Sequence, residues 1–361
     1  MIALGFVTLY ANQERSYATE IAKRAQAYNI QFYRFTPISI DPMSEYVHGE
    51  IYNFQTDSWE KAEFEIPTFL YDRCFYSNDD HSKKCQPIMN WLKNRPDCIF
   101  LGHGLPNKWD IHNVLIQDKL LSPYIPTTEQ ATSTTVILHT LMKIHKIILK
   151  PEKGSMGRGI VGLVLHRSYA EAIYKENGQL RTTQFATRGD LKNWLSDNIL
   201  TQPYLMQPYL PLHDENNRPF DIRILLQKDP KGKWIEQGRG IRQGFVDHII
   251  SNIDGGGQII SFEKWSESLS DNQKLLLQEN IQTLTTRLPF LLEEQFSPLF
   301  ELGIDVGVTK DGALWLLDTN SKPGRKVLLQ TTSDEKKEEL YTAPLRYCLY
   351  LHSQLSGLKR S

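Results

Sequence analysis

The sequence has almost no surplus charge of either sign. Its 361 residues carry 41 Lys plus Arg against 42 Asp plus Glu, a formal net charge of −1. Proteins that follow a phosphate backbone or an anionic membrane surface concentrate positive charge, so neither nucleic acid nor a membrane surface is an expected partner. The apolar run at 1–11 is too short to cross a bilayer and lacks the basic start of a signal peptide. We therefore expect no membrane insertion and a cytoplasmic location.

Cysteine is also scarce. The four cysteines are spaced too widely and irregularly for a metal-binding pair or a dense disulfide framework. The ten histidines are scattered, and no pair such as His103 and His112 has ligand spacing beside an acidic or Cys partner. We expect reduced thiols and no zinc site.

The sequence does contain enough apolar residues, 40% of the chain, for two or three folded domains. The first 106 residues alternate β-branched runs with amphipathic segments, which predicts strands at 2–9, 31–35, 67–75 and 98–101 and helices at 16–28 and 81–93. Alternation of this kind is typical of an α/β domain with a mostly parallel sheet. A Pro/Gly-rich stretch at 102–106 marks its expected boundary.

The pattern changes after residue 106. A helix is expected from 107 to near Leu121, another at 132–145, and then a strand, a glycine-rich loop and a second strand between 146 and 165. Further along, a long helix begins near Asp271, and Pro289 is expected to kink or end it. We divide the chain into domains at 1–106, 107–205 and 206–361.

The loop after Lys150 is rich in glycine, with Gly154, Gly157 and Gly159 between two strands. Such a loop can bring backbone N–H groups over an anion, because glycine permits close approach and positive φ. It is neither a Walker loop nor a Rossmann fingerprint, since both need a helix after the glycines. Two interpretations stay open, an ordinary surface hairpin and a phosphate-binding loop, and nearby Lys153 and Arg158 favour the second.

A second informative segment is 300–320. Lys-Asp-Gly at 310–312 predicts a tight hairpin between strands at 303–308 and 313–320. Asp318 and Asn320 then share one face, and the hairpin can place Asp305 beside them. Oxygen ligands of this type suit Mg²⁺ that bridges substrate phosphates. The alternative, three exposed strand residues, fits poorly with the apolar neighbours of these positions.

Arg223, Arg239 and Arg242 lie between these two segments. The planar guanidinium donates two parallel hydrogen bonds to a phosphate or a carboxylate. The alternative for each is an ordinary surface or ion-paired arginine, because exposed arginines are abundant.

The order of these motifs resembles that of the ATP-grasp superfamily over about residues 107–345. The ordered elements are a lysine strand with its glycine loop, Gln-Pro-Tyr-Leu at 207–210, Asp-x-Arg, and Asp followed by Asp-x-Asn. Finer features, Asp-Ile-Arg at 221–223, Trp234, Gly-Arg-Gly-Ile-Arg at 238–242, Ser-Asn followed by Gly-Gly-Gly within 251–257, and Asn-Ser-Lys-Pro-Gly-Arg at 320–325, resemble the YheC/YheD-like group associated with the coats of bacterial endospores. The resemblance implies an α/β (α+β) fold, in which an N-terminal pre-ATP-grasp α/β domain precedes a two-lobed ATP-grasp module with a C-terminal helix.

The resemblance also assigns roles to residues. Lys119 and Lys150 match the lysines that hold the phosphates of ATP, and Asp305, Asp318 and Asn320 match the ligands of Mg²⁺, with two ions expected. Asp318 stands where Glu is commoner. The remaining assignments are the mobile phosphate loop (Lys153, Gly154, Ser155, Met156, Gly157, Gly159), the linker that reads adenine (Gln207, Pro208, Tyr209, Leu210), the catalytic cations (Lys150, Arg223, Arg239, Arg242) and the border of the acceptor site (Asn252, Ser321, Lys322, Gly324, Arg325).

The function implied is that of a Mg·ATP-dependent carboxylate–amine ligase that works through an acyl phosphate, with a small-molecule or peptide carboxylate and an amine acceptor. Cations and Mg²⁺ stabilise the transferring phosphoryl group, and a closed loop excludes water. The sequence offers no arrangement for a protein nucleophile. The alternatives are an ATP-grasp kinase that phosphorylates a hydroxyl and a non-catalytic coat protein that keeps the fold, with spore-coat proteins as partners.

Overall fold

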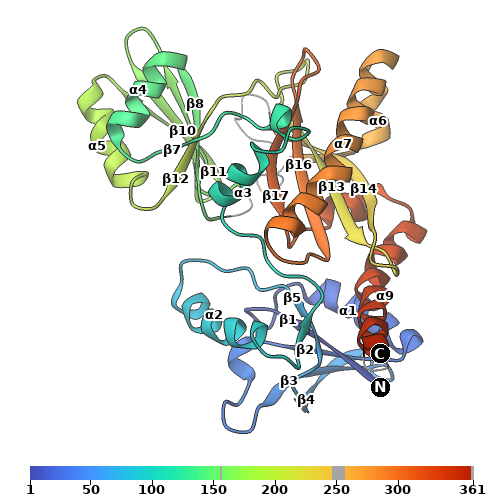
Figure 1. Cartoon of the computed structure of the whole chain (residues 1–361). Coiled ribbons are helices and arrows are strands. Elements are labelled where there is room, and N and C mark those ends of the chain that lie inside the picture. Colours follow the sequence, from blue (N-terminus) through green and yellow to red (C-terminus); the bar gives the residue numbers. More distant parts are fainter. Residues whose placement is uncertain (155–156, 246–256, 359–361) are drawn as a thin grey trace.

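The computed structural model describes residues 1–154, 157–245 and 257–358, and within them the strands form three sheets (Figure 1). The first sheet has the order β4-β3-β2-β1-β5-β6, the second β11-β10-β9-β8-β12-β7 and the third β15-β14-β13-β16-β17. Helices pack on all three, so the predicted mixed α/β fold class is confirmed. The division into three domains stays a prediction. The strand of the second sheet that comes last in the sequence, β12 (Tyr204–Pro208), crosses the expected boundary at 205.

The first sheet is parallel only in part. Strands β2, β1, β5 and β6 run parallel, whereas a hairpin of two mainly polar strands, β3 and β4, adds antiparallel pairs at one edge. The sequence did not predict this hairpin, because few of its side chains are fully buried and they leave little apolar periodicity. The elements are β1 (Ile2–Val7), α1 (Arg15–Ala25), β2 (Ile30–Phe35), β3 (Tyr46–Asn53), β4 (Ser58–Glu65), β5 (Phe69–Asp72), α2 (Asp80–Lys93) and β6 (Ile99–Phe100).

Alternate residues of β1 serve the two faces of this sheet. Leu4 and Phe6 pack against α1 and against the C-terminal helix α9 (Asp334–Leu358), whereas Val7 packs towards α2 on the other face. The C-terminal helix α9 and the N-terminal elements β1 and α1 therefore share one hydrophobic core. The four cysteines are buried free thiols.

The second sheet is antiparallel and carries the glycine-rich loop. Strands β8 and β9 pair on either side of that loop, as predicted, and α4 and α5 cover one face of the sheet with the core residues Ile137, Leu141, Leu191 and Leu195. The elements are α3 (Lys108–Leu115), β7 (Glu129–Gln130), α4 (Thr134–Ile144), β8 (Lys146–Pro151), β9 (Val161–Leu165), β10 (Ala170–Glu176), β11 (Gln179–Phe185), α5 (Arg188–Asn198) and β12.

The third sheet separates an apolar face from a charged one. Ile222 and Ile224 pack against the long helix α7, which runs through Pro289 to Gln295 and does not end there, because buried leucines on both sides of the proline anchor it to the core. Arg223, which lies between them, and Leu225 point to the opposite face, where Leu225 packs against Val327 and Leu328 of α8. The elements are β13 (Phe220–Lys228), β14 (Trp234–Gln243), β15 (Gln258–Ser261), α6 (Phe262–Ser266), α7 (Asp271–Gln295), β16 (Glu301–Val308), β17 (Leu314–Asn320), α8 (Lys326–Thr331) and α9.

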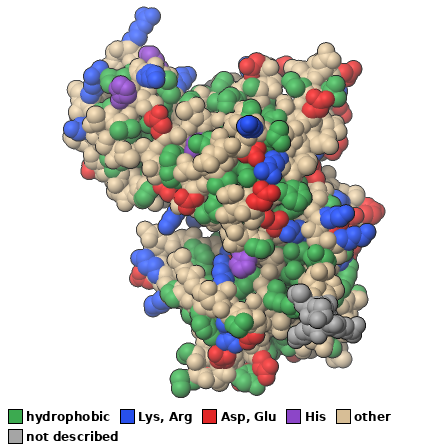
Figure 2. All heavy atoms as spheres, in the orientation of Figure 1, with side chains coloured by type: hydrophobic (Ala, Val, Ile, Leu, Met, Phe, Trp, Pro, Cys, Tyr) green, Lys and Arg blue, Asp and Glu red, His purple; other side chains and the backbone are tan. Residues whose placement is uncertain are grey.

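The surface matches the balanced composition. The face shown in Figure 2 carries both Lys and Arg and Asp and Glu side chains, with the former more frequent on the lobe at the upper left and the latter along the upper right. Of the helices in the described part of the chain, none combines the length and the apolar character that a membrane crossing needs.

Candidate active site

A β-bulge turns the predicted acidic residues towards one another. Strands β16 and β17 pair antiparallel, with Val306 opposite Leu316 and Asp305 opposite Asp318, so that Leu317 has no partner in the ladder. The extra residue reverses which face the following side chains use. Leu316 therefore packs in the apolar core, while Asp318 lies on the charged face opposite Asp305.

Two arginines hold Asp305 on this face. Arg242 Nη2 lies 2.9 Å from Asp305 Oδ2, and Arg223 Nε lies 2.8 Å from Oδ1. Burial opposes ionisation of Asp305, but the two guanidinium groups together lower its pKa. Arg242 also contacts Asp221, with Nε 2.7 Å from Oδ1, and Asp221 was not predicted as a site residue. Arg223 is thus attached to the site carboxylate alone, whereas Arg242 has a second anchor.

The third predicted arginine does not join this cluster. Arg239 and Arg242 are an odd number of residues apart on β14, so their side chains leave opposite faces of the sheet. Arg239 pairs with Glu236 at 2.6 Å and stacks on Phe262. Glu236 therefore neutralises the charge of Arg239 on the face of the sheet opposite Asp305.

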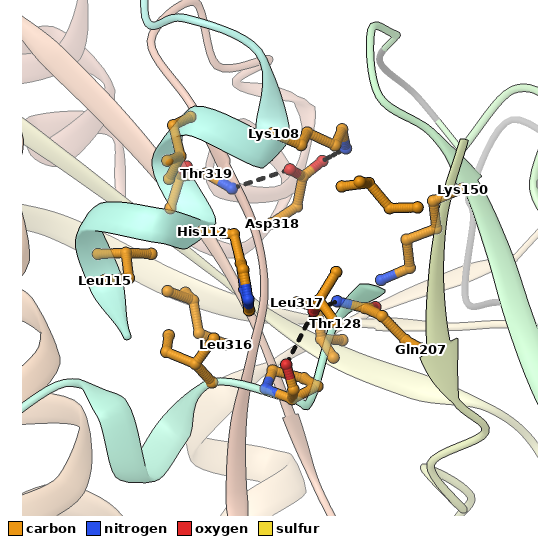
Figure 3. A pocket seen from close by; sticks show the side chains of 14 residues that line it. Lys108, His112, Leu115, Thr128, Lys150, Gln207, Leu316, Leu317, Asp318 and Thr319 are labelled. Atoms are coloured by element: carbon orange, nitrogen blue, oxygen red, sulfur yellow. Dashed lines mark hydrogen bonds and ion pairs between the residues drawn. The ribbon is translucent and has the colours of Figure 1, made fainter. Parts of the chain in front are cut away.

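Two lysines border a cavity next to the acidic pair (Figure 3). Lys108, at the start of α3, places Nζ 2.7 Å from Asp318 Oδ2. Lys150, on β8, points into the cavity, and burial followed by repulsion from Lys108 lowers its pKa to about 8, against the attraction of Asp318 and Asp305. An acidic pair and two lysines thus meet between the second and third sheets.

The far wall of the cavity combines apolar side chains with two consecutive hydrogen bonds. Gln207 Nε2 donates to Thr128 Oγ1 at 2.8 Å, and the Thr128 hydroxyl donates to the Pro126 carbonyl at 2.8 Å. His112 also faces the cavity, and burial lowers its pKa. The cavity encloses about 60 Å³, well below the roughly 300–1,000 Å³ of small-molecule sites.

The structure brings Lys108, and not Lys119, to this cavity. The helix expected to reach Leu121 ends at Leu115, and Lys119 is exposed in the turn beyond it. That turn is fixed by Asp118, which accepts hydrogen bonds from the N–H groups of Leu120 and Leu121. A usable signal for Lys108 was its place directly after Asn107, whose side chain caps α3.

The predicted nucleotide loop follows Lys150 and the predicted linker begins at Gln207, and both of these residues line the cavity. Gly154, Gly157 and Gly159 all have positive φ, and Tyr204 donates to the Gly159 carbonyl at 3.0 Å. Lys153 is exposed. Gln207 lines the cavity, and the chain continues through Pro208 to Tyr209, whose N–H donates to the Lys146 carbonyl, and then to Leu210. Ser155, Met156 and Asn252 lie outside the described residues.

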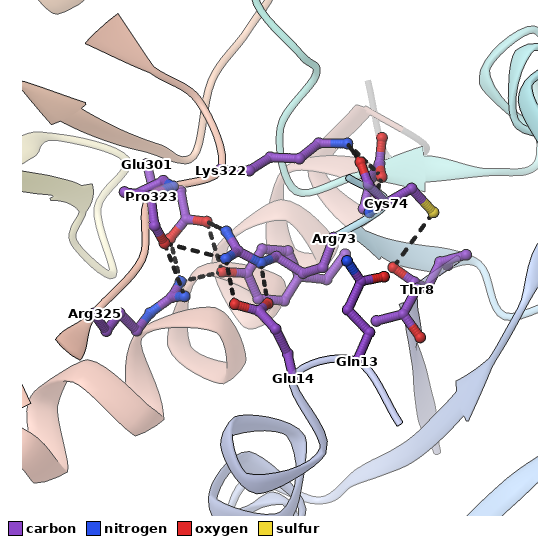
Figure 4. Close-up of polar contacts among 12 residues, drawn as sticks. Thr8, Gln13, Glu14, Arg73, Cys74, Glu301, Lys322, Pro323 and Arg325 are labelled. Carbon is purple, nitrogen blue, oxygen red and sulfur yellow. Dashed lines mark hydrogen bonds and ion pairs between the residues drawn. The ribbon is translucent and has the colours of Figure 1, made fainter. Parts of the chain in front are cut away.

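The residues expected at the acceptor site connect the third sheet to the first (Figure 4). Ser321 Oγ accepts from the Leu105 N–H, Lys322 Nζ lies 2.7 Å from Asp72, and Arg325 pairs with Glu301. Gly324 is exposed. Lys322 and Arg325 therefore have protein partners, and the structure shows them as links between sheets.

The acidic pair fits a hard cation. Asp305 Oδ1 is buried and lies 2.8 Å from Arg223 Nε, but no donor meets it with hydrogen-bond geometry, so the ion pair satisfies this carboxylate oxygen only in part. Asp318 and Asn320 share its face of the hairpin, and carboxylate and amide oxygens are ligands that Mg²⁺ accepts. The described residues contain no cluster of three or more His, Cys, Asp or Glu side chains arranged to hold a metal. A cation here would rely on the two carboxylates, the amide and oxygens of its substrate.

Comparison with known proteins gives a family match over most of the chain. The model of YheC/D-like ATP-grasp proteins matches residues 97–351. The endospore coat-associated protein YheC of Bacillus subtilis (strain 168) is 40% identical over 356 residues, which cover 99% of this chain and 98% of the relative. The endospore coat-associated protein YheD of the same organism is 22% identical over 278 residues, covering 76% of this chain and 60% of YheD.

Solved structures share the fold at low sequence identity. The D-cycloserine synthetase DcsG superposes with a TM-score of 0.55 at 9% identity, covering 98% of this chain and 99% of that one. D-alanyl-alanine synthetase A from Vibrio cholerae O1 superposes with a TM-score of 0.52 at 12% identity, covering 96% and 98%. The architecture around the cavity is therefore one on which known synthetases are built.

Proposed function

The chain belongs to the YheC/D-like ATP-grasp family, and we propose that it is a Mg·ATP-dependent ligase that joins a carboxylate to an amine through an acyl phosphate. The observation that carries the proposal is the convergence of Lys108, Lys150, Arg223 and Arg242 on Asp305 and Asp318. Transfer of a phosphoryl group requires this kind of electrostatic positioning and no protein nucleophile.

Each side chain has a role that follows from its surroundings. Lys108 and Lys150 approach the phosphates of the nucleotide from the cavity, and the loop with Gly154, Gly157 and Gly159 covers them. Asp305, Asp318 and Asn320 hold Mg²⁺, which neutralises phosphate charge when bound. Arg223, whose Nη1 is buried without a hydrogen-bond partner, turns from Asp305 to the transferring phosphoryl group.

The proposed reaction has two steps. A carboxylate oxygen attacks the γ-phosphorus and ADP leaves, which forms an acyl phosphate. An amine then attacks the acyl carbon, inorganic phosphate leaves, and the amine loses a proton. Because Lys150 has a pKa of about 8, it holds a positive charge at neutral pH while lying in a largely desolvated position. Arg242, fixed by Asp221, maintains positive charge beside the acyl phosphate.

Trapping of the activated acyl group tests the proposal. With Mg·ATP and hydroxylamine, amino acids and short peptides are screened one carboxylate at a time, and the expected result is ADP release with formation of a hydroxamate. An Asp318→Asn variant is the matched control and should lower the rate of both by about 10²–10³-fold. A stable phosphorylated product without hydroxamate would replace the ligase with a kinase.

The relatives named as coat-associated give the cellular setting of the proposal. We place the reaction in the cytoplasm of a sporulating cell, on a small-molecule or peptide substrate connected with the coat. The alternative is a non-catalytic coat protein that keeps the fold. Calorimetric titration with Mg·ADP tests the nucleotide site, which the ligase must have, and substrate-dependent ADP release then separates the ligase from a non-catalytic protein that only binds nucleotide.

A further inference from the structure

The cavity beside Lys150 has a charged part and an apolar part (Figure 3). Lys108, Lys150 and Asp318 line the charged part. Under the proposed function the phosphates take this part, which leaves the base of the nucleotide to the other. Gln207 and Thr128 lie there, hydrogen-bonded to each other. The remaining lining of the cavity is mainly aliphatic (Ile111, Leu115, Ile125, Leu205, Leu316, Leu317).

Strand pairing places Gln207 between Thr128 and the strand of Lys150. Thr128 directly precedes β7, which pairs with β12 on one side. Strand β8 pairs with β12 on the other side, with Lys150 opposite Leu205. Because alternate residues of a strand share a face, Gln207 lies on the face of Lys150, two residues or about 6.6 Å further along. A nucleotide whose phosphates meet Lys150 can therefore present its base to Gln207.

The hydrogen bonds of Thr128 fix which way the amide of Gln207 faces. Thr128 is 9% exposed, and its hydroxyl donates its single proton to the Pro126 carbonyl at 2.8 Å. The hydroxyl oxygen can then only accept, and it receives Nε2 of Gln207 at 2.8 Å. Because the amide is planar, Oε1 is left to the cavity that Gln207 lines, and within the described ranges it accepts no hydrogen bond.

The opposite direction of the amide would cost a hydrogen bond. With Oε1 turned to Thr128, the hydroxyl would have to donate to Gln207, and the carbonyl of the buried Pro126 would lose this donor. A buried acceptor without a donor is destabilising. The direction seen in the structure is therefore the favoured one.

The backbone after Gln207 has no free donor at the next two positions. Pro208 has no N–H, and Tyr209 donates its N–H to the Lys146 carbonyl at 3.2 Å. A base that lies beside Gln207 is therefore recognised at this point through the side chain of Gln207, and the direction of its amide decides which base fits.

We propose that Thr128 is a positioning residue for base selection, which holds Gln207 so that Oε1 accepts from the amino group at C6 of adenine and repels the oxygen that hypoxanthine and guanine carry there. The inference rests on the proposed function in one respect, that a nucleotide binds in this cavity. A carboxylate in place of the amide would need no such positioning, because both of its oxygens accept.

ADP and inosine diphosphate (IDP) are the matched probes, because their bases differ only in the group at C6 and in the proton on N1. Calorimetric titration of the full-length protein with Mg²⁺ and each nucleotide gives the two affinities. ADP should bind about 100-fold more tightly, since IDP replaces a hydrogen bond with two acceptors that face each other. Equal affinity, or binding of neither nucleotide, overturns the proposal.

Variants of Thr128 test the positioning. Thr128→Val keeps the shape of the side chain and removes the hydroxyl, so the amide can turn, and the preference for ADP over IDP should fall about tenfold. Thr128→Ser keeps a hydroxyl and should keep the preference. Thr127→Val, at the exposed neighbouring position, is the matched control and should change nothing. A merely structural role of Thr128 would weaken both nucleotides equally, and an unchanged preference in Thr128→Val overturns the proposal.

A double-mutant cycle with Gln207 locates the effect. Gln207→Glu presents acceptors only, so its preference for ADP should persist, and adding Thr128→Val should no longer lower that preference. A tenfold loss on adding Thr128→Val to both Gln207 and Gln207→Glu backgrounds would mean that Thr128 acts through another group, and it overturns the proposal.

Failure of base selection and failure of the ligase give different results. Hydroxamate formed equally well with ATP and with inosine triphosphate keeps the proposed function and rejects base selection by Gln207. A preference for ADP that depends on Thr128, without hydroxamate from any carboxylate, keeps base selection and rejects the ligase.

Discussion

Strand β16 carries two carboxylates on one face, Glu301 and Asp305, and each is held by two arginines, but the two clusters differ in how completely they are satisfied. Glu301 accepts from Arg73, Arg325, Tyr71 and Gln227, and both of its oxygens have hydrogen-bond donors. In the described part of the chain Asp305 forms ion pairs with Arg223 and Arg242, and although Arg223 Nε lies 2.8 Å from Oδ1, that oxygen accepts no hydrogen bond of normal geometry.

The surroundings of the two clusters differ in the same direction. Arg73 and Glu301 are almost completely buried, and their partners come from the first and the third sheet. Beside Asp305, the charge of Lys108 and Lys150 borders a cavity. A buried carboxylate with every hydrogen bond made stabilises one arrangement of the chain, whereas an unsatisfied one beside surplus cations is available to a ligand. We therefore expect changes at Glu301 to affect folding and changes near Asp305 to affect binding and turnover.

The largest effect is expected at Glu301. Glu301→Gln leaves two buried guanidinium groups without their shared charge, which should lower the free energy of unfolding by about 3–5 kcal/mol. Urea unfolding followed by circular dichroism measures it. Glu63→Gln, at an exposed position of β4, is the control and should stay within about 0.5 kcal/mol of the parent protein. A loss of stability at Glu301 no larger than in that control would mean that the cluster around Glu301 does not hold the sheets together.

The next effect concerns turnover. Asp318→Asn removes one charge opposite Asp305, and because Asp318 is partly exposed and has a single lysine partner, stability should change by less than about 1 kcal/mol. Turnover should fall by about 10²–10³-fold, as when one preorganised electrostatic contact to a transition state is lost. ADP release and Mg²⁺-dependent binding of ADP are the measurements. Full activity, or equal ADP affinity in EDTA, contradicts the metal assignment.

The cluster around Asp305 was largely predictable from the sequence, because the residues that place Asp305 and Asp318 lie close together along the chain. The Lys-Asp-Gly turn and the alternation of residues 303–320 placed Asp305 opposite Asp318. The bulge at Leu317 was not predictable in this way, since an extra residue interrupts the alternation on which the prediction depends. Arg242 lies beside Asp305, while Arg239 does not, and their odd spacing along β14 already implied that the two side chains leave opposite faces of the sheet.

The cluster around Glu301 has no local sequence pattern of this kind. Glu14 and Arg73 lie at least 228 residues before Glu301 and Arg325 in the sequence, and nothing in any one segment indicates that they meet. The same limit applies to Lys108 and Lys119, which stand near the two ends of one expected helix. Lys108 reaches the cavity from the first residue of α3. Lys119 does not, because α3 ends at Leu115 and Lys119 lies in the turn that Asp118 fixes.

These two lysines form a matched pair that sharpens the assignment. Lys108→Ala removes a charge within the cavity and should weaken binding of Mg·ADP by about 10–100-fold, the effect of one hydrogen bond to a charged group. Lys119→Ala, eleven residues on and exposed, should leave the affinity unchanged. Calorimetric titration of both variants gives the answer. The reverse pattern would return the phosphate role to Lys119 and show that the helix extends further when nucleotide is bound.

The smallest effect is a pH dependence that has opposite signs for binding and for stability. The folded pKa of Lys150 is about 8 instead of 10.5, so between these pH values the unfolded chain holds a proton that the folded chain has released, and stability rises with pH. Affinity for Mg·ADP should fall over the same range, by about tenfold from pH 7 to 9, because the protonated fraction of Lys150 falls by that factor. The charged groups facing Lys150 are Lys108, Asp318 and Asp305, and His112, whose pKa is lowered by burial, stays neutral throughout. Lys150→Arg keeps its charge over this range and should bind Mg·ADP equally at both pH values, so a tenfold loss that persists in Lys150→Arg would assign the titration to another group.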